Sequence, residues 1–365
     1  MATSRRKFLK SGVAAGAGLG ILRTSPVSAR RNAQTAIPTP RARQLMALFG
    51  LQYPVFQAPH GFATGPELAV AISNAGAMGA LALSGRTADA ARQLVATVRR
   101  QTKQPFLVNY ILTFGAPSVA VVLEAGAPVV QFSWGLPTTS LIAQVRGAGA
   151  RLGIQVGNVD GARAALDAGA DYLVCQGTEA GGHVQSSTRL YDLLPQVLEE
   201  AQSTPVLAAG GIGSGQKIRE ALLAGAAGAV LGTRFVATQE SLAHSEYKNA
   251  IVRAQASDTA LTVCFQDGWP GATHRVLRNA TLARWEAAGC PRVGRRPGEG
   301  DVVATRADGT KVLRYYLGSP DRELNGAITD FAMHAGHGVD EVKDLPPARD
   351  LVRRLWAECI DVSRA

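Results

Sequence analysis

The sequence predicts an α/β fold, namely a parallel (β/α)8 TIM barrel followed by a C-terminal cap segment. From residue 51 to about residue 238, short apolar runs alternate with longer helical patterns. This alternation is typical of parallel strands that are connected by helices. In addition, Ala-Gly-Ala recurs just before candidate strands, where glycine suits the left-handed end of the preceding helix. These repeats lie at 75–77, 125–127, 168–170 and 224–226.

The candidate strands of the barrel are short and follow one another at regular spacing. They are residues 55–57, 77–82, 106–109, 129–132, 152–156, 172–175, 206–208 and 229–231. Helical patterns lie between them, for example at 67–74, 88–101, 161–168 and 217–224. A short apolar run alone does not distinguish a strand from a buried helix, so the prediction depends on the alternation. Strands in this number and order favour a closed barrel, which we assign to residues 51–240.

After Thr238 the regular alternation ends. Residues 241–345 are predicted to form a cap over the mouth of the barrel, and residues 346–365 a helical segment that packs on its wall. The expected elements are a helix near 246–255, an irregular stretch at 291–300, a helical pattern near 325–335 and a final helix at 347–360.

The N-terminal segment predicts export. Residues 1–29 combine a basic start, a weakly apolar stretch and a small-residue end, which is the layout of an export signal. Within them, Ser-Arg-Arg-Lys-Phe-Leu-Lys at 4–10 resembles the twin-arginine motif, which directs folded proteins across the bacterial inner membrane. Residues 30–50 are interpreted as a basic tether. We therefore expect a periplasmic or secreted protein that engages the twin-arginine export machinery and has no stable membrane insertion.

The net charge of +10 would suggest a nucleic-acid partner if it were spread over the fold. However, residues 1–29 contain five basic residues, residues 30–43 contain four more, and neither stretch contains an acidic one. The chain from Gln44 onward is therefore near neutral, and a nucleic-acid groove is not expected. The four cysteines lack metal-ligand spacing, so no metal site is expected. They are interpreted mainly as buried thiols, with a Cys264–Cys290 disulfide left open.

Two glycine-rich stretches lie where barrels of this kind bind phosphate. Residues 208–215 follow the seventh candidate strand, and Gly232-Thr233-Arg234 ends the eighth. Small residues expose backbone N–H groups there, and the N-terminus of a helix adds its positive end. The two stretches together predict a phosphate site.

A third stretch, Gln176–His183, follows the sixth candidate strand. Gly181 and Gly182 would let the backbone pass close to a flat ligand and hold His183 over it. Histidine accepts or donates a proton near neutral pH, so His183 is the candidate catalytic residue. The alternative is a loop histidine bonded to solvent or to a carbonyl. Glu179 is interpreted as an anchor of this loop.

Six stretches in order resemble the nitronate monooxygenase (2-nitropropane dioxygenase) family of FMN-dependent barrels, which also contains FMN-dependent enoyl-ACP reductases. They are residues 54–59, 74–76, 105–109, 176–183, 208–215 and 232–235. The resemblance implies an FMN cofactor, with His183 facing the substrate as a base for neutral nitroalkanes or as a hydrogen-bond donor to an anionic nitronate. The residues that it implies around FMN are Ala58, Pro59 and His60 along the ring through their backbone, Asn109 and Gln155 at the polar edge, Gln176 and Gly181 at the ring or ribityl chain, and Gly210, Gly211, Gly232 and Thr233 at the phosphate.

The function implied by this resemblance is an FMN-dependent nitronate monooxygenase that oxidises small alkyl nitronates with dioxygen to a carbonyl compound and nitrite. The alternatives are an FMN-dependent NAD(P)H reductase or enoyl reductase and a non-catalytic flavin-binding protein. A homodimer is left open.

Two features near the implied site have open interpretations. In the resembling family the position of His60 is usually Met. His60 either supplies a second proton carrier or favours an anionic substrate, or it only bonds a loop carbonyl. The second feature is a set of aromatic residues that either wall the substrate pocket or belong to the core, namely Phe62, Tyr110, Phe132 and Trp134.

Overall fold

The computed structural model describes residues 37–61 and 63–361. The predicted export signal, the first part of the predicted tether and Phe62 lie outside the described residues. Within the described ranges, no helix has the length and apolar character that crossing a membrane requires.

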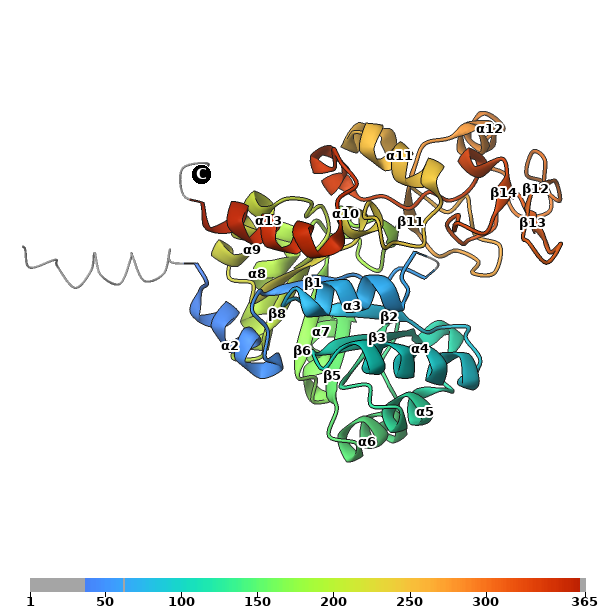
Figure 1. The fold of residues 1–365 in the computed structure, drawn as a ribbon. Helices are drawn as coiled ribbons and strands as arrows, with labels where there is room; N and C mark the ends of the chain where they lie inside the picture. Colours follow the sequence, from blue (N-terminus) through green and yellow to red (C-terminus); the bar gives the residue numbers. More distant parts are fainter. Residues whose placement is uncertain (1–36, 62, 362–365) are drawn as a thin grey trace, which may run out of the picture. The chain divides into compact units, whose positions relative to one another are not determined.

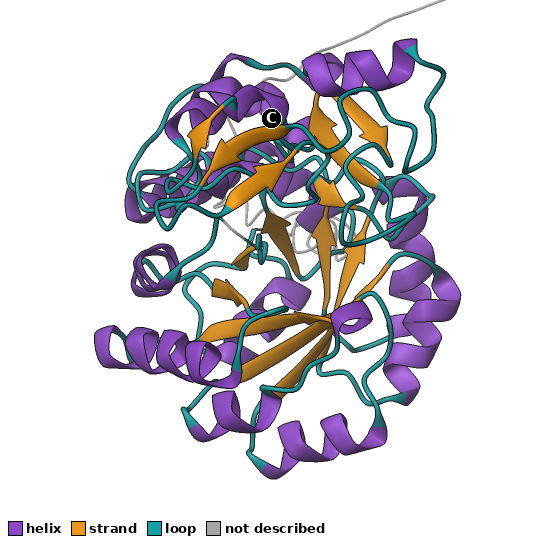
Figure 2. Ribbon diagram, turned by 90° about the vertical axis from the view of Figure 1, so that its right-hand side faces the viewer, coloured by secondary structure: helices purple, strands orange, loops and turns teal. Residues whose placement is uncertain are grey.

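Eight parallel strands form the predicted barrel, and helices surround it (Figures 1 and 2). Their order around the sheet is β1-β9-β8-β6-β5-β4-β3-β2, and a bridge between Phe56 and Met78 joins the two ends. The barrel strands are β1 (Val55–Gln57), β2 (Gly79–Ala82), β3 (Phe106–Ile111), β4 (Val129–Ser133), β5 (Arg151–Val156), β6 (Tyr172–Gln176), β8 (Val206–Ala209) and β9 (Gly228–Leu231). The predicted fold class is confirmed, and each predicted strand overlaps an observed one.

The helices of the barrel begin and end at signals that the sequence contains. Thr87 and Asn158 accept hydrogen bonds from the backbone N–H groups of Ala90 and Gly161, which caps two helices. The glycines of the Ala-Gly-Ala repeats have φ angles between 77° and 103°, so they act as the predicted left-handed helix ends. These helices are α3 (Pro66–Asn74), α4 (Ala88–Gln101), α5 (Val119–Glu124), α6 (Thr139–Gly147), α7 (Val159–Asp167), α8 (Leu190–Ala201) and α9 (Gly215–Leu223), with the short η1 (Leu112–Phe114) after β3.

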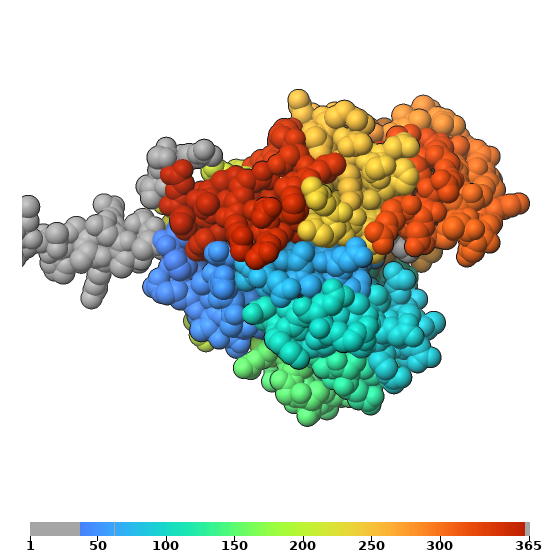
Figure 3. All heavy atoms as spheres, viewed as in Figure 1, coloured from blue at the N-terminus to red at the C-terminus, as the bar shows by residue number. Residues whose placement is uncertain are grey.

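The eighth barrel helix comes from the end of the chain. After β9 follow a short helix, α10 (Thr233–Val236), and the cap, and then α13 (Ala348–Ile360) packs against both α9 and α3 (Figure 1). Figure 3 shows the same relationship on the surface, with the C-terminal helix in red beside the blue N-terminal part of the barrel. The cap is thus inserted between the eighth strand and the eighth helix.

The cap contains helices and two small sheets. One sheet, in the order β10-β11-β7, includes a strand from the barrel loop after β6, so it joins the cap to the barrel. The cap elements are α11 (Ser245–Arg253), η2 (Ala256–Asp258), β10 (Thr259–Thr262), β11 (His274–Leu277), α12 (Ala280–Ala287), β12 (Val302–Thr305), β13 (Lys311–Leu313), β14 (Asn325–Gly326), η3 (Ile328–Asp330) and η4 (His337–Glu341), and the strand from the barrel loop is β7 (Gly182–His183).

The helix predicted near 325–335 is wrong. Its first two residues pair with β12 as β14, only η3 is helical, and Gly326 has a φ of 145° that a helix does not allow. The apolar spacing that suggested a helix has another cause: Leu324, Ile328 and Phe331 pack into one small cluster with the strands of the cap. The other predicted helices of this region are observed as α11 and α13.

The predicted tether at 30–50 also needs correction, because its second part forms α2 (Pro40–Phe49). Thr39 caps this helix, Pro40 occupies its first turn, and Gly50 ends it with a φ of 69°. The Phe49 ring packs on Phe56 and on Tyr172, with centroids 5.7 Å and 5.4 Å away. Helix α2 therefore contributes to the barrel core near the amino end of β6.

The Cys264–Cys290 disulfide, which the sequence left open, is not formed. All four cysteines are free, and Cys290 is exposed whereas Cys264 is buried. The interpretation as mainly buried thiols holds for Cys175, Cys264 and Cys359.

Candidate active site

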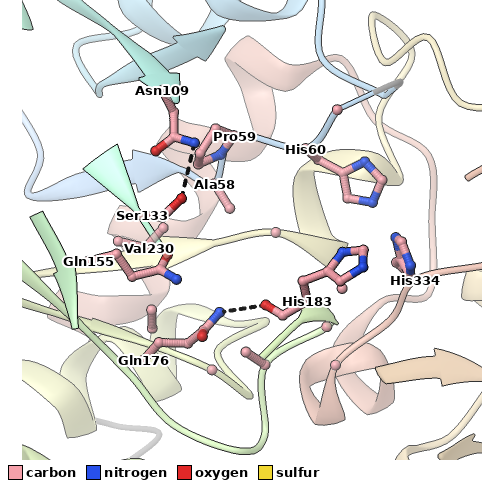
Figure 4. Close-up of a pocket in the computed structure, with 18 of the residues that line it drawn as sticks. Ala58, Pro59, His60, Asn109, Ser133, Gln155, Gln176, His183, Val230 and His334 are labelled. Atoms are coloured by element: carbon pink, nitrogen blue, oxygen red, sulfur yellow. Dashed lines mark hydrogen bonds between the residues drawn. The ribbon is translucent and has the colours of Figure 1, made fainter. Parts of the chain in front are cut away.

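A single pocket at the carboxyl ends of the barrel strands contains every residue predicted for the site. These are Ala58, Pro59, His60, Asn109, Gln155, Gln176, Gly181, His183, Gly210, Gly211, Gly232 and Thr233. The cap completes the pocket with residues that were not predicted from the sequence, namely Trp269, Leu317, Gly318, Ser319, His334, Gly336 and Gly338. Figure 4 shows amide side chains on one side of this pocket and three histidines on the other.

A row of buried polar side chains orients the amide side of the pocket. The Tyr172 hydroxyl donates to Gln131 Oε1 (3.0 Å), and Gln131 Nε2 donates to Asn109 Oδ1 (3.1 Å). Because its carbonyl oxygen is held in this way, Asn109 turns Nδ2 toward Ser133 Oγ, 3.4 Å away. The barrel interior thus fixes which end of the Asn109 amide is presented to a ligand.

Gln155 and Gln176 are held by the loop that follows β6. Gln155 Nε2 donates to Gln185 Oε1 at 2.8 Å, while Gln176 Oε1 accepts from the Gln185 N–H at 2.8 Å. Gln176 Nε2 donates to the carbonyl of His183 at 3.2 Å. The amide groups and the backbone of the candidate catalytic residue are therefore parts of one network.

Glycines form a narrow cradle where the phosphate was predicted. Gly210 and Gly211 have φ angles of 123° and 70°, which side-chain-bearing residues rarely adopt. A Cβ on Gly181 would lie 2.4 Å from the backbone nitrogen of Gly336, and the Gly336 N–H donates to Thr233 Oγ1 at 3.0 Å. The cradle therefore depends on close backbone approach between the loops after β6 and β8, the start of α10 and the cap.

The second half of the predicted phosphate stretch has a different role. The N–H of Gly213 donates to Glu341 Oε2 at 2.9 Å, and the N–H of Gly215 donates to Glu358 Oε2 at 3.0 Å. Carboxylates thus occupy the start of α9, which was expected to face the phosphate. Of the residues 208–215, those that line the pocket are Ala209, Gly210, Gly211 and Ile212.

His183 lies in β7 at the edge of the cap sheet, where it is paired in register with His274. Its ring is stacked on Trp269, and its Nε2 atom is buried without a partner among the described residues. Burial is the main cause that lowers the pKa of His183 to about 3, and the nearby His274 and His60 contribute in the same direction. His183 is therefore neutral at pH 7.

Three further histidines surround His183, and only His60 of these was predicted from the sequence. The ring of His334 lies 5.4 Å from that of His183 and 5.6 Å from that of His60, while His274 lies 5.3 Å from His183. His274 is saturated, since Nδ1 bonds the Ala272 carbonyl and Nε2 accepts from the Phe265 N–H. Within the described ranges, no group of three His, Cys, Asp or Glu side chains is arranged to hold a metal ion.

The aromatic residues considered for the pocket wall divide between pocket and core. Trp134 lines the pocket from a left-handed backbone position with a φ of 58°. Tyr110 and Phe132 are instead buried in the layer between strands and helices. The predicted anchor is confirmed, because Glu179 Oε2 accepts from the N–H of Leu190, the first residue of α8, at 2.9 Å.

The comparisons with known proteins agree with this architecture. A model of the family described as nitronate monooxygenase matches residues 42–118 and 108–358. The nitronate monooxygenase of Pseudomonas aeruginosa is 32% identical over 358 residues and covers 85% of this chain and 97% of its own length. A (3aS,4S,5R,7aS)-5-hydroxy-7a-methyl-1-oxo-octahydro-1H-indene-4-carboxyl-CoA dehydrogenase of Mycobacterium tuberculosis is 36% identical over 249 residues, covering 67% of this chain and 68% of its own. The solved structure of a nitroalkane oxidase from Streptomyces ansochromogenes is 31% identical, with a TM-score of 0.70 over 86% of this chain and 97% of its own.

Proposed function

Because this chain belongs to the nitronate monooxygenase family and is an oxidoreductase, we propose that it oxidises small alkyl nitronates with dioxygen, using bound FMN, to a carbonyl compound and nitrite. The observation that carries the proposal is the placement of neutral His183 across one pocket from a side lined by amides and from a glycine cradle. The same pocket thus offers a cofactor-binding surface and a candidate catalytic group.

The residues present fit FMN. Gly210, Gly211, Gly232 and Thr233 would hold the phosphate through the cradle, where an added Cβ at Gly211 would lie 3.1 Å from Glu179 Cβ. No acidic side chain among the described lining residues would repel a phosphate. The oriented amides of Asn109, Gln155 and Gln176 would face the polar edge of the ring, with the backbone of Ala58, Pro59 and His60 along it. When bound, the flavin accepts electrons from the substrate and passes them to dioxygen.

The pKa of His183 favours a nitronate over a neutral nitroalkane. A general base works best when its pKa lies near the working pH, and burial lowers the pKa of His183 to about 3. A neutral imidazole still donates a hydrogen bond through its N–H group. We therefore assign His183 to holding and orienting a substrate that is already an anion, rather than to removing its proton.

An anaerobic mixing experiment tests this proposal. Ethyl nitronate should bleach the flavin absorbance of the purified holoprotein, whereas NADPH should leave it unchanged. Bleaching by NADPH alone would support the reductase alternative, and no bleaching by either would support a non-catalytic protein. His183→Asn should slow bleaching by ethyl nitronate and keep the flavin bound, because no cradle residue is altered; loss of the flavin would contradict the role assigned to His183.

The proposed site of action lies outside the cytoplasm, on the basis of the twin-arginine motif at 4–10. Replacing Arg5 and Arg6 with lysine should retain the protein in the cytoplasm, as measured by fractionation of expressing cells. The matched control replaces Arg30 and Arg31, which lie after the motif, and should leave export intact. Equal export of both variants would contradict the proposal.

A further inference from the structure

His60 and His334 present buried ring nitrogens to the pocket beside His183 (Figure 4). His60 comes from the loop after β1 and His334 from the cap, so two separate parts of the fold bring them within 5.6 Å of each other, centroid to centroid. No group in the described part of the chain bonds either ring nitrogen of His60 or Nε2 of His334. Buried polar atoms are normally hydrogen-bonded, so these atoms point to a ligand.

The hydrogen bonds of Ser319 fix the tautomer of His334. The Ser319 hydroxyl donates to the Ala332 carbonyl at 2.9 Å, because a carbonyl oxygen only accepts. The His334 Nδ1 atom, 3.0 Å from Ser319 Oγ, must then be the donor in their bond. In a neutral ring this leaves a lone pair and no proton on Nε2, the atom that faces the pocket.

A lone pair repels an anion, so an anion can bond Nε2 of His334 only if that nitrogen first takes a proton. His60 differs, because neither of its ring nitrogens has a partner and one of them carries a proton in the neutral ring. His60 can therefore donate to an anion without changing its charge. The two rings offer an oxyanion two donors and, once His334 is protonated, a positive charge.

Among the described residues that line the pocket, a proton on His334 is the available source of positive charge. The described residues that line the pocket include no Lys, Arg, Asp or Glu. The titratable groups that face the pair are His183 from β7, His274 from β11 and Tyr247 from α11. Burial lowers the pKa of His60 to about 4 and that of His334 well below its ordinary value, so both are neutral before a ligand binds.

We propose that His60 and His334 bind the oxyanion end of the substrate, and that the anion enters together with one proton from solution, which His334 takes at Nε2. This inference rests on the proposed function, whose substrate is a monoanion, and adds the two side chains and the proton that would bind it. By linkage, the dissociation constant of such an anion should rise about tenfold for each pH unit while the free ring is neutral and the bound ring is charged.

Nitrate is a suitable probe, because it is a planar oxyanion with the shape of a nitro group and is not a nitronate. The holoprotein is titrated with nitrate at pH 6, 7 and 8, with binding followed by tryptophan fluorescence and by calorimetry in two buffers of different ionisation enthalpy. We expect uptake of about one proton per nitrate and about tenfold weaker binding per pH unit. Affinity that does not change with pH, or the absence of nitrate binding, would overturn the proposal.

Variants locate the proton. His334→Gln keeps a donor for Ser319 but removes the titrating nitrogen, so nitrate should bind more weakly and without proton uptake. His60→Asn should weaken binding and leave proton uptake in place. His244→Asn alters a histidine that caps α11 outside the pocket and should change neither property. Unchanged proton uptake in His334→Gln would overturn the assignment, and the proton count in the unmodified protein does not depend on the folding of any variant.

The nitrate-binding test and the flavin-bleaching test can fail independently of each other. Proton-linked nitrate binding without bleaching by ethyl nitronate would support the anion site and contradict the monooxygenase. Bleaching by ethyl nitronate without proton-linked nitrate binding would support the monooxygenase and contradict the anion site.

Discussion

The indole ring of Trp269 is stacked on the imidazole ring of His183, with centroids 4.4 Å apart and an interplanar angle of 24°. Trp134 contacts the same indole edge-on at 4.6 Å, and Phe114 does so at 4.9 Å. Trp269 belongs to the cap, whereas Trp134 and Phe114 belong to barrel loops. The orientation of the candidate catalytic ring therefore depends on contact between the cap and the barrel.

Trp269→Leu should lower kcat/KM for ethyl nitronate by about 2- to 10-fold, which corresponds to the about 0.5–1.5 kcal/mol of an aromatic pair. The flavin content should not change, because the substitution leaves the glycine cradle intact. The matched control is Trp356→Leu, since Trp356 packs on Tyr53 and lies outside the pocket. Equal kinetics of the two variants would show that the stack does not orient His183.

Gly181→Ala should abolish flavin binding. Its Cβ would lie 2.4 Å from the Gly336 nitrogen and 2.6 Å from the Ala335 carbonyl carbon, so the loop after β6 and the cap would have to move apart. The measurement is the ratio of flavin to protein absorbance after purification, with circular dichroism to confirm folding. Gly147→Ala is the control, because nothing lies within 4 Å of the added carbon, and it should retain the flavin. A flavin-loaded Gly181→Ala protein would contradict the proposed cradle.

The sequence was sufficient to predict the barrel and the site residues that the barrel contributes, because both depend on local signals. Apolar runs mark strands, Gly76 and its counterparts end helices, and Gly210 and Gly211 mark a backbone that side chains would block. The sequence did not show that Trp134 lines the pocket whereas Phe132 belongs to the core, since the strands of a parallel barrel are apolar on both faces. The orientation of these side chains appears only when the sheet closes.

The cap contribution was missed for a different reason. His334 reaches His60 and His183 across long separations in the sequence, and the helical spacing around it predicted the wrong element. The one available signal was that the cap segment contains His244, His274, His334 and His337, four of the six histidines in the chain. Residues 325–335 show the same limit, since apolar residues at helical spacing served a small cluster between strands.

Stability should fall as the pH falls from about 6.5 toward 4. The pKa of His60 is lowered to about 4 and that of His183 to about 3, so in this range the unfolded chain binds protons that the folded chain does not. Each such group reduces the free energy of unfolding by about 1.4 kcal/mol per pH unit inside the window and contributes nothing above it. Urea unfolding of the holoprotein at pH 7, 6 and 5 measures the slope.

Carboxylates also titrate toward the lower end of this window, so the comparison between variants isolates the histidines. His60→Gln should reduce the pH dependence of the free energy of unfolding, because the unfolded chain then takes up one proton fewer relative to the folded chain. His244→Asn should keep the pH dependence of the unmodified protein, since His244 does not line the pocket that contains His60 and His183. The prediction is wrong if the two variants show the same slope.

Leu45→Ala should destabilise the barrel, although Leu45 lies in a segment whose sequence suggested a tether. Leu45 is fully buried in the inner cluster that includes Phe56 and Tyr172, and its Cδ2 atom lies 2.7 Å from where a Cβ on Gly228 would be. Removing a buried leucine side chain costs about 2–5 kcal/mol, because apolar burial is lost and a cavity is left. The lower free energy of unfolding is measured by urea titration. Leu48→Ala makes the same chemical change at a half-buried position of α2 and should cost less. If both variants matched the unmodified protein, α2 would not be part of the cooperative core, and the segment would be a tether after all.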